Sequence, residues 1–388
     1  MAFTSRRMDN LTPLFFAALD ERIAAMKTAG VDIIRLDVGS PDLAPDPAIV
    51  TALSQSALVL DRHGYTSHNG PLVLREAWSQ LYWREFGVKL NPENEVLPLL
   101  GSKEGIFHIL LALIDPGDVV LIPDPGYPTY TQGTTISGGI PYFMPLQPER
   151  GFLPDLSVIP AGIAQKAKVL WLNYPNNPTA ATASLEFFAE AVEFAQQYDI
   201  LVCHDAAYSL ITYDGFQSPS ALQIPSAKER MVEFNSLSKS HNMAGWRVGV
   251  AVGNNKALRD LLTLKTHADS GHFMPVLDGA VVALTGDQRW LHERNLVYQQ
   301  RRDIIVSELI QMGLMATKPK ASLYVWCPLP QGYTSLEFAE AVLDNAYVSL
   351  TPGIVFGKMG DRYVRFSLTS SLERTREAMQ RLKNWMKP

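Results

Sequence analysis

The segment 236–249 holds the residues of this chain whose types and spacing are best suited to covalent chemistry. Lys239 lies between Ser238 and Ser240, and Arg247 follows eight positions later. A lysine amine condenses with an aldehyde to form a Schiff base, and serine hydroxyls together with an arginine fork can hold a phosphate. An aldehyde and a phosphate on one small molecule describe pyridoxal phosphate (PLP). We therefore expect Lys239 to carry the chemistry and other polar groups to surround the same cofactor.

The elements that must position these groups alternate between strands and helices. Buried strands are expected at 95–100, 118–122, 169–173, 200–204, 232–236 and 247–252, and helices at 104–114 and 185–198. This alternation predicts an α/β fold with a mostly parallel sheet covered on both faces. Ligands of such sheets bind beyond the carboxyl ends of the strands. Polar residues follow the predicted strands at 101–102, 124, 173–179, 205 and 236–239, so we expect them to meet at one edge.

The two ends of the chain have a different pattern. A long helix is predicted at 288–312, an alanine-rich helix at 336–346 and a strand at 362–368. The last helix opens at Ser370 with the spacing of a capping box. We predict a large domain at 46–283 and a smaller α+β domain made of 1–45 and 284–388, with the site in the cleft between them.

Bulk composition excludes several classes of protein. The net charge of −5 gives no basis for a nucleic-acid surface, and 47% apolar residues fit a globular chain with a large core. Apolar runs stay short of the roughly 20 residues that span a membrane, and no signal-like block follows the N-terminus. Cys203 and Cys327 lie in apolar runs, which favours buried free thiols and a reducing compartment. We expect a cytoplasmic protein without nucleic-acid or membrane partners.

Over nearly its whole length the chain resembles fold-type I PLP-dependent enzymes of the class I and II aminotransferase family. Within that family it is most similar to LL-diaminopimelate aminotransferases. The resemblance implies a homodimeric transferase that moves an amino group between an L-amino acid and a 2-oxo acid. The donor it implies is LL-diaminopimelate or a related amino acid, with 2-oxoglutarate as acceptor.

The resemblance assigns three residues to catalysis. Lys239 would be the Schiff-base lysine and then the base that moves a proton between the substrate Cα and the cofactor C4′. Asp205 directly follows a buried strand, where an acid needs a partner, and the resemblance pairs it with the pyridine nitrogen. Tyr208 would donate to the cofactor O3′. A metal site on His204 and Asp205 is the rival interpretation, but no HExxH or Cys/His cluster accompanies it.

Further residues would bind the cofactor. Asn177 would join Tyr208 at O3′, and Tyr127 would stack on the pyridine ring. Tyr65 would reach the phosphate of the neighbouring subunit's cofactor, although its spacing alone favours an ordinary core or surface tyrosine. The turn 101–104 opens a helix, and on its own it is equally well an ordinary N-cap. The residues expected around the phosphate are Ser102, Lys103, Ser236, Ser238 and Arg247.

The substrate is expected to contact a second group of residues. Arg365 matches the arginine that pairs with the substrate α-carboxylate, and Arg362 is its local competitor on the opposite face of the strand. The Gly39 backbone N–H would bind the same carboxylate, and Lys103 would lie beside the substrate. Tyr127 and Asn177 would contact substrate as well as cofactor.

Several positions depart from the diaminopimelate enzymes. Leu14 replaces a tyrosine, His267 an asparagine that reaches over from the partner subunit, and Ala321 the first glycine of a Gly-Gly pair. A usual glutamine is missing from 275–278, and Ala180 replaces a glycine without removing a functional side chain. Because leucine forms no hydrogen bond with a polar distal group, we hypothesise a donor that is less polar at its far end.

Three other functions share some of these features. A PLP-dependent β-lyase or decarboxylase would use the same cofactor residues. A PLP-binding regulator would need a DNA-binding module, for which no basic segment remains. A NAD-dependent dehydrogenase would need a G-x-G-x-x-G motif after a strand, and the sequence has none.

Overall fold

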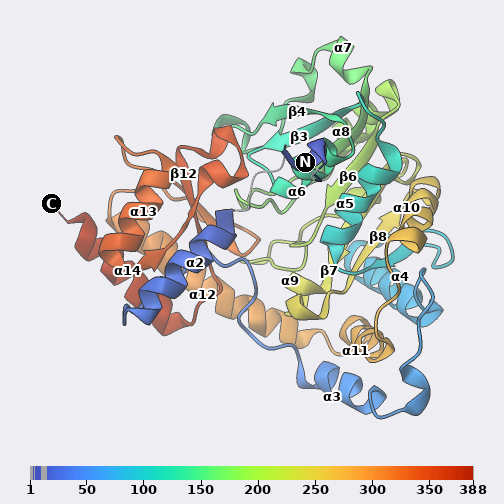
Figure 1. Ribbon diagram of the computed structural model, residues 1–388, viewed down its shortest axis with the longest axis horizontal. Helices are drawn as coiled ribbons and strands as arrows, with labels where there is room; N and C mark the ends of the chain where they lie inside the picture. The colour runs from blue at the N-terminus through green and yellow to red at the C-terminus, as the bar shows by residue number, and fades with distance from the viewer. Residues whose placement is uncertain (1–2, 4, 10–14, 388) are drawn as a thin grey trace.

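A seven-stranded sheet with the order β2-β8-β7-β6-β5-β3-β4 forms the larger part of the molecule (Figure 1). The computed structural model describes residues 3, 5–9 and 15–387. Strand β8 is antiparallel to both its neighbours, and the other pairings are parallel. The strands are β2 (Val96–Leu99), β3 (Val119–Asp124), β4 (Ile140–Pro145), β5 (Ala167–Asn173), β6 (Leu201–Asp205), β7 (Met231–Ser236) and β8 (Gly249–Gly253). The predicted mostly parallel α/β sheet is confirmed.

The edge strand β4 was not predicted from the sequence. Its side chains are mainly exposed or half-buried, and the strand contains Pro141 and Pro145. Exposed residues and prolines are typical of an edge strand. Such a strand lacks the continuous buried apolar run by which the other strands are recognised in the sequence.

Helices cover both faces of the sheet because alternate strand residues point to opposite sides. In β5, Leu170 and Leu172 pack into one core, and Val169 and Trp171 into the other. The first core is covered by α4 (Leu72–Phe86), α8 (Leu185–Tyr198) and α11 (Met274–Thr285), and the second by α5 (Ser102–Leu113), α6 (Pro128–Ile136) and α10 (Asn255–Ala268). Helix α3 (Pro47–Ser56) packs on α11, and α7 (Ala161–Ala164) and α9 (Leu237–Ser240) are single turns.

A second group of elements lies beside the sheet, at the left in Figure 1. It has its own apolar core, which includes Phe338, Val364 and Leu382. Its strands are β1 (Ile34–Arg35), paired with β10 (Val348–Ser349), and the antiparallel set β11 (Thr351–Pro352), β12 (Tyr363–Ser367) and β9 (Tyr324–Pro328). Its helices are α2 (Phe15–Thr28), α12 (Arg289–Gln311), α13 (Ser335–Ala346) and α14 (Leu372–Met386), and α1 (Arg6–Asp9) precedes them in the chain. The domain boundaries at residues 45 and 283 stay a prediction.

The start of the last helix differs by one residue from its prediction. The N-cap of α14 is Ser371, whose hydroxyl accepts a hydrogen bond from the Arg374 backbone N–H at 3.2 Å. Ser370 instead donates to the Arg35 carbonyl at 2.8 Å. Two adjacent serines have equal capping chemistry, so a tertiary contact decides which of them caps the helix.

Both cysteines behave as the sequence predicts. Cys203 and Cys327 are buried free thiols, and burial raises the pKa of each. Among the described helices, none combines the length and the apolar character that crossing a bilayer would require.

Candidate active site

A cavity of about 400 Å³ opens at the carboxyl edge of the sheet and is walled on its other side by the second group of elements. Nine of the residues predicted for the site line it: Gly39, Ser102, Lys103, Tyr127, Asn177, Asp205, Tyr208, Lys239 and Arg365. Parallel strands β2, β3, β5, β6 and β7 end at this edge. Because β8 is antiparallel, its first residue lies at the same edge, which brings Arg247 there as well.

Lys239 lies on the single helical turn that follows β7. Its Nζ donates a hydrogen bond to the Gly39 carbonyl at 2.6 Å, across the junction between the two groups of elements. Burial lowers the pKa of Lys239 from its ordinary value, and the charges of Arg365 and Arg247 act in the same direction. A lowered pKa increases the neutral fraction of the amine, which is the form that acts as a nucleophile or a base.

Asp205 ends β6 as a buried anion. Its carboxylate accepts hydrogen bonds from the Tyr130 hydroxyl at 2.8 Å and from the Ala207 N–H at 3.3 Å. No cation lies within ion-pair distance among the described residues, and burial raises the pKa of Asp205. The carboxylate thus lacks the positive partner that a buried acid normally has.

His204 does not share a site with Asp205. Its Nδ1 lies 2.9 Å from the Glu233 carboxylate and its Nε2 lies 3.0 Å from the Tyr174 carbonyl. Both ring nitrogens therefore have partners inside the core. Since neighbouring strand residues face opposite sides of the sheet, the rival interpretation of a metal site on these two residues is wrong.

Arg365 is the buried cation of the cavity. It is 3% exposed, and its Nη1 and Nη2 donate to the Asn177 side-chain oxygen at 2.8 Å and the Asp37 carbonyl at 2.9 Å. These acceptors are neutral, Nε has no partner in the described part of the chain, and no carboxylate there lies within ion-pair distance. Arg362, its competitor, bonds to carbonyls of Pro330 and Tyr333 outside the cavity.

Tyr324 is a cavity residue that the sequence did not reveal. Its hydroxyl hydrogen-bonds to the Tyr208 hydroxyl at 2.8 Å, and its ring lies 4.1 Å below the Arg365 guanidinium. A Cβ at Gly39 would lie 2.7 Å from the same hydroxyl, which explains the need for glycine there. The only sequence signal was a strand of alternating aromatic residues, because the contact depends on the pairing of β9 with β12.

The expected phosphate-binding groups lie around the turn between β2 and α5. The Arg247 guanidinium packs against Gly101 so closely that a Cβ at that position would overlap it. Arg247 Nη1 donates to the Ser238 hydroxyl at 3.4 Å, and the start of α5 adds N–H groups that attract anions. Ser236, Ser238 and Arg247 do not themselves line the cavity, and the Ser236 hydroxyl caps α9 by accepting from the Ser238 N–H at 3.1 Å.

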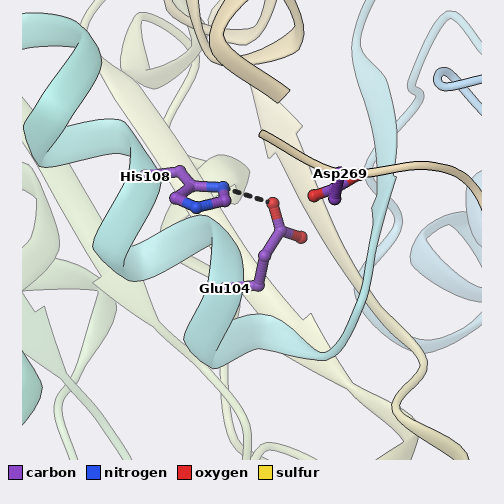
Figure 2. A group of neighbouring side chains, drawn as sticks. All are labelled: Glu104, His108 and Asp269. Carbon is purple, nitrogen blue, oxygen red and sulfur yellow. Dashed lines mark hydrogen bonds and ion pairs between the residues drawn. The ribbon is translucent and has the colours of Figure 1, made fainter. Parts of the chain in front are cut away.

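Charged side chains lie around the first turns of α5, next to this turn (Figure 2). Glu104 accepts from the Leu100 N–H at 3.0 Å and lies 2.8 Å from His108 Nδ1. Lys265 lies 2.6 Å from Asp269 and 3.7 Å from Glu104. Although these two acids and His108 are close enough to be metal ligands, the Lys265 ammonium already supplies a positive charge between the carboxylates. The network therefore fixes the start of α5.

The residues expected to reach a neighbouring subunit do not line the cavity of this chain. Tyr65 is 94% exposed, and His267 is exposed in the last turn of α10. Ala180 and Ser322, which stand where glycine is usual, have φ values of 57° and 77°. Leu14 lies outside the described residues.

Comparison with known proteins agrees with the fold and the family expected from the sequence. The chain belongs to the class I and II aminotransferase family, which matches residues 31–382. It is 50% identical to the LL-diaminopimelate aminotransferase of Moorella thermoacetica over 379 residues, which cover 98% of this chain and 97% of that protein. It is 47% identical to the enzyme of that name from Desulforudis audaxviator, with the same coverage of both chains.

Solved structures show the same fold. The structure of apo-BacF from Bacillus subtilis has a TM-score of 0.97 and 37% identity, covering 100% of this chain and 99% of that one. A mutant aspartate aminotransferase from Thermus thermophilus has a TM-score of 0.93 and 27% identity, covering 99% and 100%. The protein is thus an aminotransferase of fold type I, and the family and activity predicted from the sequence are confirmed.

Proposed function

We propose that the protein uses PLP to transfer an amino group from LL-diaminopimelate, or a related amino acid, to 2-oxoglutarate. One observation carries this proposal. Lys239, whose pKa is lowered, shares a cavity with a buried anion, Asp205, and a buried cation, Arg365, neither of which has a counter-ion in the described part of the chain. A cationic ring nitrogen and an anionic substrate carboxylate are the charges that would complete such a cavity.

The residues of the cavity fit each part of the cofactor. Asp205 would pair with the pyridine nitrogen, Tyr127 would face the ring, and Tyr208 with Asn177 would reach O3′. The phosphate would be held by the side chains of Ser102, Ser238 and Arg247 and by the backbone N–H groups at the start of α5, including that of Lys103, with Ser236 supporting that loop from the N-cap of α9. When bound, PLP supplies an electron sink for the bond that breaks at the substrate Cα.

The chain's own side chains would orient the substrate and move one proton. Arg365 presents a fork of donors to the α-carboxylate, and the Gly39 backbone lies beside it. Lys239 would hold the cofactor covalently and, once released by the substrate amine, would carry the proton between Cα and C4′. Catalysis would then come mainly from orientation and from a lysine whose pKa lies closer to the working pH.

The proposed donor is supported by the names of the relatives and by Lys103. Two relatives that share 47–50% of their residues with the chain are LL-diaminopimelate aminotransferases. Lys103 lines the cavity and has no carboxylate within ion-pair distance among the described residues, so its ammonium is available for a substrate carboxylate. These observations favour a donor that is charged at its far end.

The working form would be a cytoplasmic homodimer. Tyr65 exposes almost its whole side chain in the single chain and would reach the phosphate of the neighbouring site, and the region around His267 would also face the partner. Light scattering of the wild type measures the assembly, and a Tyr65→Phe variant should bind PLP more weakly. A monomer with full activity would disprove the shared site.

An absorbance spectrum tests the cofactor, and a donor panel tests the reaction. The protein loaded with PLP should absorb at the edge of the visible range, and the band should disappear on borohydride treatment and in Lys239→Ala. Lys256→Ala, at an exposed helical lysine, is the matched control and should keep the band. Release of ammonia and pyruvate without an acceptor would identify a β-lyase, and release of carbon dioxide a decarboxylase.

A further inference from the structure

A chain of three charged residues enters the cavity from α2 and β1, outside the sheet edge. Arg35 donates from Nε and Nη2 to the two oxygens of the Asp37 carboxylate, at 2.7 and 2.6 Å. Its Nη2 also lies 2.8 Å from Asp20 Oδ1. All three residues line the same cavity as Lys103 and Arg365. Nothing in the predicted cofactor site accounts for them.

The charges of this chain do not cancel. Arg35 pairs with two carboxylates, so the three side chains carry one surplus negative charge. Asp37 is fully buried and is bound through both of its oxygens by the guanidinium, so the surplus charge lies at Asp20. The Asp20 side chain is 60% exposed, and its Oδ2 has no hydrogen-bond partner in the described part of the chain. Lys103 supplies one surplus positive charge to the same cavity. An ammonium and a carboxylate on one carbon carry the two complementary charges.

We propose that Asp20 is a specificity-determining residue that accepts a hydrogen bond from a second ammonium group at the far end of the amino donor, with Lys103 binding the carboxylate beside it. Arg35 is then a positioning residue, since it fixes one Asp20 oxygen while buried Asp37 fixes the guanidinium. This inference rests on the proposed function and adds to it a residue that distinguishes diamino donors from monoamino donors. It also replaces the expectation of a less polar far end.

Two donors of equal length separate the far ammonium from the far carboxylate. LL-diaminopimelate carries both groups, and L-2-aminopimelate carries only the carboxylate. We would measure kcat and KM for both with the PLP-loaded wild type, Asp20→Asn, Asp20→Glu and the control Glu21→Gln, whose exposed side chain does not line the cavity. Thermal midpoints of the four proteins verify that each variant is folded.

The Asp20→Asn variant should lower the ratio of kcat/KM for LL-diaminopimelate to that for L-2-aminopimelate by about tenfold, the worth of one partly exposed hydrogen bond between charged groups. The change should appear in KM, because the far ammonium is remote from the reacting Cα. Asp20→Glu should restore most of the ratio, and Glu21→Gln should leave it as in the wild type.

Other outcomes overturn the inference in distinguishable ways. A ratio that stays within twofold in Asp20→Asn refutes it, and so does an equal loss for both donors, which would mean that Asp20 only holds α2 against Arg35. A wild type that turns over L-2-aminopimelate but not LL-diaminopimelate also refutes it. If neither donor reacts while other amino acids do, the proposed donor class fails and the inference fails with it. If no amino acid reacts, the proposed function itself is refuted.

Discussion

Replacing Asp205 by asparagine should stabilise the cofactor-free protein and impair the loaded enzyme. The side chain is 6% exposed, and its carboxylate has only neutral donors, the Tyr130 hydroxyl at 2.8 Å and the Ala207 N–H at 3.3 Å. Asparagine has the same shape and keeps an oxygen that accepts from Tyr130, but it carries no charge. The substitution therefore removes a buried charge and one long hydrogen bond, because the amide NH2 cannot accept from the Ala207 N–H.

The size and pH dependence of the gain follow from the burial of Asp205. A buried charge that lacks part of its solvation costs about 1–3 kcal/mol, so the variant should be more stable by this amount at pH 7. Burial raises the pKa of Asp205, so the native state binds its proton more tightly than the unfolded state. The free energy of unfolding of the wild type then falls as pH rises from 3.8 through the native pKa. The advantage of the variant should shrink as pH falls toward 3.8.

Thermal unfolding of the cofactor-free proteins between about pH 4.5 and about pH 8 measures this gain. With an unfolding entropy of about 2.1 cal/mol/K per residue, 1 kcal/mol corresponds to roughly 1 °C in a chain of this length. The exposed Asp115→Asn is the matched control and should change little. The loaded Asp205→Asn enzyme should lose about 10²–10³-fold in kcat/KM, because a charge that stabilises the transition state is gone. A cofactor-free variant that is no more stable than the wild type at pH ~7 would refute the reasoning, since it would show that the charge already has a partner.

Three further substitutions test other parts of the site. Gly101→Ala should weaken PLP binding by about tenfold or more, measured by titration of the cofactor-free protein, because φ is 79° and a Cβ would displace Arg247; unchanged affinity would exclude Arg247 from the phosphate site. Ser322→Gly should raise the free energy of unfolding by about 1–2 kcal/mol in urea, since φ is 77° and the buried hydroxyl has no partner in the described part of the chain. A loss of stability would show that the hydroxyl is satisfied. Arg365→Lys should lower kcat/KM for the donor by about 10–100-fold while the absorbance of bound PLP persists, because lysine cannot bind a carboxylate through two parallel hydrogen bonds; a smaller loss would mean that another cation binds the carboxylate.

The sheet-edge half of the site could be predicted because its residues follow strands directly. Asp205 is the last residue of β6, and Lys239 follows β7 by three positions. Parallel strands bring their carboxyl ends to one edge, so a local pattern is enough to place these groups together. The position of Arg247 also depends on the direction of β8, which no local pattern reveals. Because β8 is antiparallel to β7, it begins at the edge where β7 ends, and Arg247 lies just before it at that edge.

The other half of the cavity could not be predicted from the sequence because it depends on non-local packing. Tyr324 reaches the site through the register of β9 on β12, in which it pairs with Ser367. Asp20 enters from a helix whose apolar residues pack on α13, far along the chain. Charges such as Asp20 and Arg35 read as ordinary surface residues until the cavity wall is known. The departures at Ala180 and Ser322 were visible, but their backbone strain was not.

The charges that line the cavity fall into two kinds, and the difference explains the design of the site. Arg35 and Asp37 satisfy each other, and they hold Asp20 in place whether or not a ligand is present. Asp205 and Arg365 are buried without counter-ions in the described part of the chain, so folding alone leaves their charges unmatched. Such charges are costly until a ligand pairs with them. A ligand that binds only the native state stabilises it, so cofactor and substrate should recover this cost. Removing either charge should therefore raise the stability of the ligand-free protein and lower the activity of the loaded enzyme.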